Sequence, residues 1–173
     1  MNSRTFTTIA LALATLAAEP AMAQTMVVRH GNTPPGLILQ GVTVMPGATM
    51  LFLSGMLASP VDPAKAKLPP AQMATLTMAD FGDTKTQTIS ALAKIKASLA
   101  AHGFAMSDII KLTVFVAGDP KLGGKMDFAG MNDGFKTAFG TAENPATVAR
   151  STVQVAALAG PNFLVEIEAT AAK

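Results

Sequence analysis

Two runs of alternating side chains near the end of the chain constrain the fold more than any other feature of the sequence. Residues 145–155 and 164–169 are rich in β-branched residues and are bounded by Pro or Gly. This combination is typical of β-strands. The two runs are therefore predicted to be strands joined by a short loop.

The alternation also assigns side chains to faces, because neighbouring side chains in a strand point to opposite sides. In the first run Arg150, Thr152 and Gln154 share one face. In the second run Glu166 and Glu168 point away from the apolar side. An arginine and a glutamate placed in this way could meet across a cleft.

The rest of the chain supplies four more strands and two helices, judged by periodicity and turn residues. The expected strands are 26–30, 37–45, 49–54 and 109–116, and the expected helices are 84–102 and 127–139. A Pro-Gly turn is predicted to join the second and third strands as a hairpin. This order predicts an α+β fold in which one six-stranded mixed sheet carries both helices on one face.

Two further expectations concern packing. Gly130 and Gly134 lie inside the second helix, where each costs about 1 kcal/mol relative to alanine, so close packing against the sheet is expected. Ile110, Leu112 and Val114 are expected on the sheet face that the helices leave uncovered. An exposed apolar face marks an interface, and other copies of the chain are its simplest cover.

The first residues are typical of a targeting segment. A short basic start, an apolar run at 7–18 and Ala-Met-Ala at 21–23 predict a cleaved signal peptide. Residues 1–23 are then removed, and residues 24–173 form a single domain that begins at Gln24. The apolar run is too short to span a bilayer, so the mature chain is expected to be exported and free of the membrane. In a Gram-negative source the destination is the periplasm.

Composition excludes several functions. The formal net charge is only +2, which is too weak for a nucleic-acid footprint. The chain has no cysteine, which excludes disulfides and thiolate chemistry. His30 and His102 lack metal-ligand spacing, and no phosphate-binding glycine motif occurs. Neither a metal nor a cofactor is therefore expected.

Arg150 is the side chain that most needs a partner. A guanidinium lining a sheet is costly unless it meets an anion, and its planar fork suits a carboxylate. The residues alone leave two interpretations open. Arg150 forms a salt bridge with Glu166 or Glu168, or it binds an acidic ligand.

The run P-A-T-V-A-R-S-T-V-Q-V-A, followed by V-E-I-E-A, resembles the C-terminal signature of the RidA/YjgF family of enamine/imine deaminases. The resemblance extends over roughly residues 27–171. It implies a homotrimer with a ligand site in each cleft between subunits. It also implies cofactor-free hydrolysis of 2-imino acids to 2-keto acids and ammonia.

The resemblance assigns roles to individual residues. Arg150 falls on the arginine that holds the substrate carboxylate, and Glu166 falls on the glutamate that holds or activates the attacking water. Gly55 borders the pocket, where a backbone N–H can approach a small anion. Asn132 matches a polar residue near the pocket. The alternative for Glu166 and Asn132 is a solvent-facing position without a function.

Two positions depart from the family pattern. Ile38 stands where active members carry a tyrosine, and Thr152 stands where they often carry a cysteine. Thr152 keeps a hydroxyl, but Ile38 cannot donate a hydrogen bond. The pocket is therefore expected to be more apolar, and the alternative function is a non-catalytic trimer that binds small carboxylates. A ribonuclease activity, sometimes attached to the family, ranks last because the chain lacks a basic patch.

Residues 57–82 form a longer connection than the resembling family has. Four prolines and scattered Lys and Ala indicate an inserted loop. Long loops of this kind are often functional or mobile, but a solvated surface excursion is the simpler interpretation.

Overall fold

The structure is a computed structural model that describes residues 26–173. The expected signal peptide, residues 1–23, lies outside the described residues. The strands are β1 (Val27–His30), β2 (Gly41–Val44), β3 (Met50–Leu57), β4 (Ile109–Ala117), β5 (Ala149–Val155) and β6 (Val165–Ala172). The helices are α1 (Pro70–Met73), α2 (Met78–Phe81), α3 (Thr84–Ala101) and α4 (Phe128–Phe135), with short 3-10 turns at η1 (Lys65–Lys67), η2 (Met106–Asp108) and η3 (Pro120–Leu122).

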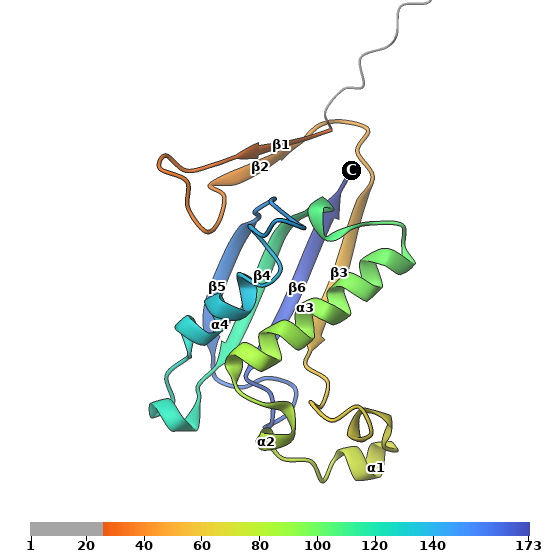
Figure 1. Ribbon diagram of the computed structural model, residues 1–173, viewed down its shortest axis with the longest axis vertical. Helices are drawn as coiled ribbons and strands as arrows, with labels where there is room; N and C mark the ends of the chain where they lie inside the picture. The colour runs from red at the N-terminus through yellow and green to blue at the C-terminus, as the bar shows by residue number, and fades with distance from the viewer. Residues whose placement is uncertain (1–25) are drawn as a thin grey trace, which may run out of the picture.

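The strands form two sheets instead of the single six-stranded sheet that was expected. Four of them make a mixed sheet in the order β3-β6-β4-β5, in which β4 and β5 run parallel and the other pairs are antiparallel. The strands β1 and β2 pair only with each other, and this hairpin lies across one end of the larger sheet (Figure 1). The α+β class is confirmed, but the single sheet is not.

The predicted hairpin between the second and third strands is wrong. The turn itself forms, with the Ala48 N–H donating to the Met45 carbonyl and Gly47 at a φ of +94°. The turn connects the two sheets, because β3 pairs along its length with β6 and not with β2.

The hairpin of β1 and β2 is fastened to the larger sheet through Arg29. Its Nη1 donates to the carbonyls of Ile109 at 2.9 Å and Thr147 at 3.0 Å. Its Nη2 donates to the carbonyl of Ser107 at 2.5 Å. One guanidinium thus ties β1 to the segments that lead into β4 and β5.

The two long helices cover one face of the larger sheet, as predicted (Figure 1). Asp83 caps α3 by accepting from the Thr86 N–H, and Asp127 caps α4 by accepting from the Gly130 N–H. The core between helices and sheet is formed mainly by Leu92, Ile95, Leu99, Met131, Phe135, Leu112, Val114, Val116, Val165, Ile167 and Ala169. These side chains hold both helices on the sheet through apolar burial.

Gly134 makes the close contact that its position in α4 suggested, but with a different partner. A β-carbon there would lie 2.6 Å from Cβ of Thr88 on α3. This is closer than real side chains approach, so only glycine fits. The glycine therefore brings α4 against α3, and the expectation that it packs on the sheet is wrong.

The uncovered face of the larger sheet differs in composition from the expectation. Leu112 and Val114 are buried under the helices, because they share a face with Ile167 and Ala169. The open face carries Phe52, which is 71% exposed, and Val153, which is 44% exposed. It also carries Lys111, Thr113, Phe115, Glu166 and Glu168, so it is a mixed surface with apolar patches.

The segment of residues 57–82 contains more regular structure than the loop that was expected. It contains α1 and α2 and lies at the end of the sheet opposite the hairpin (Figure 1). Phe81 packs edge-on against Phe163 at 4.9 Å between ring centroids, and Asn162 donates to the Leu76 carbonyl at 2.6 Å. None of the helices in residues 26–173 has the length and apolarity that crossing a membrane requires.

Candidate functional site

Arg150 lies on β5, at the edge of the larger sheet, and points to the face that the helices cover. Its register partner is Leu112, which is fully buried under the helices. Its Nη2 donates to Oδ1 of Asn132 on α4 at 2.6 Å. The guanidinium carbon lies 4.5 Å from the centroid of the Phe135 ring. A short polar contact and an aromatic face thus hold the guanidinium in one orientation.

This environment leaves the guanidinium incompletely paired. Among the described residues Arg150 forms no ion pair with Glu166 or Glu168, so the salt-bridge interpretation does not apply within one chain. Its Nη1 is buried and has no hydrogen-bond partner in the part of the chain that the structure describes. Burial lowers the pKa of Arg150 below its ordinary value. A buried cationic donor without a partner is costly, and an anionic ligand would offset that cost.

Thr152 shows the same feature two residues further along the strand. As expected from the alternation, it shares the face of Arg150, and its register partner is the buried Val114. Its Oγ1 is buried and lacks a partner among residues 26–173. Two donors without partners therefore lie on neighbouring positions of one strand face. A carboxylate has two oxygens, which can accept one hydrogen bond from each of these donors.

Glu166 lies on the opposite face of the same sheet. Its register partners are Phe115 on β4 and Leu57 on β3. The register of β3 slips between Leu53 and Met56, and Gly55 lies within this irregularity. A β-carbon at Gly55 would overlap the Glu166 carboxylate. Gly55 thus leaves the space that the Glu166 side chain occupies.

The six predicted site residues therefore fall into separate groups. Arg150 contacts Asn132 of α4 on the helix-covered face, where Thr152 also lies, whereas Gly55 and Glu166 meet on the open face. One chain does not bring Arg150 and Glu166 together, because strand pairing places them on opposite sides of the sheet.

Ile38 lies in the loop of the hairpin and packs against the hydrophobic core. Its carbonyl accepts from Asn32 Nδ2 at 2.7 Å. The following residue, Leu39, donates its N–H to the Val148 carbonyl at 3.0 Å. The loop is thereby held beside the start of β5, two residues before Arg150.

Phe135 is the neighbour of Arg150 that the sequence analysis did not assign to the site. It is buried on α4, four residues after the buried Met131. The signal that could have found it is its position three residues after Asn132, on the same side of α4. No group of three or more possible metal ligands occurs within residues 26–173.

The structure thus joins an α+β fold to a buried, incompletely paired guanidinium at a sheet edge, a position suited to an anionic ligand. Comparison with known proteins identifies the family. The family described as Endoribonuclease L-PSP matches residues 42–173, more than half of the chain. The chain belongs to this family, which is the RidA/YjgF family.

Individual relatives agree with this assignment. A 2-iminobutanoate/2-iminopropanoate deaminase of Escherichia coli is 31% identical over 152 residues, covering 88% of this chain and 99% of that protein. A RutC family protein of Pyrococcus horikoshii is 37% identical over 123 residues, covering 71% of this chain and 79% of that protein.

Solved structures give the same result. Escherichia coli TdcF with bound serine is 31% identical, with a TM-score of 0.52 and coverage of 87% of this chain and 99% of that chain. The Rid family protein YyfB of Yersinia pestis has a TM-score of 0.62 at 22% identity and covers 86% of this chain and 100% of that chain. The YyfB similarity concerns the fold alone.

Proposed function

We propose that this protein hydrolyses 2-imino acids to 2-keto acids and ammonia. The observation that carries the proposal is the pair of buried donors without partners, Arg150 Nη1 and Thr152 Oγ1, on one strand face. Relatives that are named 2-iminobutanoate/2-iminopropanoate deaminase support the choice of reaction.

Arg150 and Thr152 bind the substrate carboxylate in this proposal. Asn132 already occupies Nη2, so the free Nη1 donates to one carboxylate oxygen and the Thr152 hydroxyl donates to the other. The Phe135 ring holds the guanidinium plane in place and limits its hydration. Charge-assisted hydrogen bonds of this kind are about twice as strong as neutral ones.

Glu166 supplies general-base catalysis. It takes a proton from a water molecule as the water oxygen forms a bond with the iminium carbon. It then returns that proton to the nitrogen, and the C–N bond breaks to release ammonia while Glu166 takes the hydroxyl proton and the ketone forms. The ammonia takes up this proton and leaves as ammonium. The overall change is iminium plus water to ketone plus ammonium, and no redox partner is required.

The proposal needs at least two copies of the chain. Arg150 and Glu166 lie on opposite faces of one sheet, so both residues contact one substrate only if a neighbouring copy contributes one of them. The exposed apolar side chains of the open face, Phe52 and Val153, provide a surface for such contact. We propose a homotrimer with sites between subunits, and light scattering of the purified protein measures the assembly.

The test uses matched substitutions on one strand. An amino-acid oxidase generates an imino acid in the cuvette, and the rate of keto acid formation is followed. Glu166→Gln is expected to lower the rate about 100-fold or more and to preserve keto acid binding. Glu168→Gln, two residues away and exposed on the same face, is the control and retains full activity. Equal rates for the two variants would refute the role of Glu166.

A non-catalytic carboxylate-binding protein is the second candidate, and Ile38 favours it because this side chain cannot donate a hydrogen bond. Calorimetry with 2-oxobutanoate separates the two functions. Saturable binding that Arg150→Ala removes, together with no acceleration of imino acid loss by the native protein, would select the binding protein. Acceleration that is lost in Arg150→Ala selects the deaminase.

We also propose that the protein acts outside the cytoplasm after removal of residues 1–23. The leader composition supports this proposal. N-terminal sequencing of the exported protein is expected to begin at Gln24. Full-length protein in the cytoplasmic fraction would refute export.

A further inference from the structure

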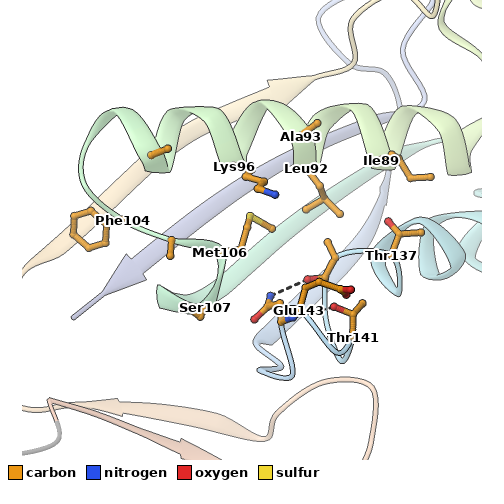
Figure 2. A pocket seen from close by; sticks show the side chains of 14 residues that line it. Ile89, Leu92, Ala93, Lys96, Phe104, Met106, Ser107, Thr137, Thr141 and Glu143 are labelled. Atoms are coloured by element: carbon orange, nitrogen blue, oxygen red, sulfur yellow. Dashed lines mark hydrogen bonds between the residues drawn. The ribbon is translucent and has the colours of Figure 1, made fainter.

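A second hollow lies away from the residues predicted for deamination. It is a cavity of about 560 Å³ between α3, the segment around η2 and the loop that follows α4. Figure 2 shows Leu92 and Lys96 reaching toward it from α3, with Thr141 and Glu143 on the opposite side. None of the six predicted site residues lines it. Its volume lies in the range of small-molecule sites, about 300–1,000 Å³.

The walls combine an apolar floor with two opposite charges. Leu92, Phe104 and Met106 supply apolar surface. Lys96 and Glu143 also line the cavity, and they form no ion pair with each other among the described residues. A ligand with an apolar body and both signs of charge is therefore complementary to these walls.

Asn144 adds a polar group that lacks a partner. This residue also lines the cavity and is only 8% exposed. Its Nδ2 donates to the Ala138 carbonyl at 2.8 Å, which fixes the orientation of the amide. Its Oδ1 is buried and accepts no hydrogen bond within residues 26–173. A buried acceptor without a donor is costly, and a ligand N–H would relieve this cost.

We propose that this cavity binds a small zwitterion with an apolar body, such as an apolar α-amino acid. The ammonium group donates to Asn144 Oδ1 and faces the Glu143 carboxylate. The ligand carboxylate faces Lys96, and the apolar side chain covers Leu92 and Phe104. The site is separate from that of the proposed deaminase and shares no lining residue with it.

Calorimetry with leucine tests this site, with three partial analogues as ligand controls. 4-Methylpentanoate lacks the ammonium group, 3-methylbutylamine lacks the carboxylate, and serine lacks the apolar body. Leucine is expected to bind at least about 2-fold more tightly than each analogue, because each one loses one of the three matched contacts. Equal affinity for leucine and all three analogues, or no saturable leucine binding, would overturn the proposal.

Matched variants then locate the site. Ala93→Phe fills the cavity rim and is expected to weaken leucine binding about 10-fold or more, whereas Ala97→Phe, exposed on the same helix outside the cavity, leaves it unchanged. Lys96→Met is expected to weaken it about 2- to 5-fold because the charge is exposed, with Lys85→Met as the control. Arg150→Met leaves leucine binding intact. Loss of leucine binding in Arg150→Met, or equal binding by the Ala93 and Ala97 variants, would show that this cavity is not the site.

Discussion

Arg29 and Arg150 are the two arginines of the described chain, and their surroundings differ in a way that separates structure from binding. Arg29 donates to three backbone carbonyls, those of Ser107, Ile109 and Thr147. Arg150 donates to one side-chain oxygen, that of Asn132, and its Nη1 has no partner in the part of the chain described.

The charges around the two guanidinium groups differ as well. Burial lowers the pKa of each, but Asp108 acts in the opposite direction at Arg29. No carboxylate offsets the effect of burial at Arg150 among the described residues. A guanidinium that donates to carbonyls of several segments fastens those segments together, whereas one with a free buried donor is prepared to receive an anion.

The largest expected effect concerns the stability of the fold. Arg29→Met leaves three carbonyls without their donor, so we expect the free energy of unfolding to fall by about 3 kcal/mol. Urea unfolding followed by circular dichroism measures the change. Arg29→Lys keeps a cation that can reach some of the carbonyls and is expected to lose less. An unchanged unfolding midpoint in Arg29→Met would show that the hairpin is held by other contacts.

Arg150→Met is expected to have the opposite result, a small change in stability and a large loss of binding. Arg150→Met removes a buried cation with an unpaired donor, so the free energy of unfolding is expected to change by less than about 1 kcal/mol. Binding of 2-oxobutanoate is expected to weaken about 100-fold, because the carboxylate loses its charge-assisted donor. Calorimetry and urea unfolding of the same preparation measure both quantities. A large loss of stability with intact binding would assign Arg150 to the fold, like Arg29.

Thr152→Val is expected to have smaller effects, a gain in stability and a loss of ligand affinity. Thr152→Val removes a buried hydroxyl without a partner, so the unliganded protein is expected to gain about 0.5–1 kcal/mol of stability. Ligand binding is expected to weaken about 5-fold, because one hydrogen bond from an uncharged donor to the carboxylate is lost. Thr152→Ser keeps the hydroxyl and is expected to bind as the native protein does. A loss of stability in Thr152→Val would mean that the hydroxyl has a partner in the assembled protein.

The sequence predicted local features of this fold better than distant ones. The alternation of residues 145–155 placed Arg150 and Thr152 on one face, and a helix was expected at residues 84–102, where α3 lies; both are confirmed. Pairing between strands depends on contacts far apart in the chain, and here the hairpin prediction failed. The turn at residues 45–48 has hairpin chemistry, but β3 finds its partner in β6, more than a hundred residues away.

The candidate site shows the same limit. The residue types at Arg150 and Asn132 indicated polar chemistry, but their contact depends on how α4 packs, and Gly134 fixes this packing through Thr88. The separation of Arg150 from Glu166 follows from the register of both strands on β4. Leu112 pairs with Arg150 and Phe115 pairs with Glu166, and neither pairing can be deduced from alternation within one strand.

The smallest expected effect on stability comes from the charged pair of Lys65 and Asp80. In the segment of residues 57–82, the Lys65 ammonium lowers the pKa of Asp80 from 3.8 to about 2, and the backbone N–H and hydroxyl of Thr77 act in the same direction. A lowered carboxyl pKa stabilises the fold above the unfolded value and loses this effect as the pH falls through the folded value. The melting temperature of Asp80→Asn is therefore expected to lie slightly below that of the native protein above about pH 4, with the difference vanishing near pH 2. Because solvent screens this pair, the fall in melting temperature should be smaller than the fall that Arg29→Met causes. A salt concentration of 0.5 M, at which the Debye length is roughly half its physiological value, should reduce the fall further. A fall in melting temperature as large as that caused by Arg29→Met would show that residues 57–82 contribute as much to the stability of the fold as the hairpin contact.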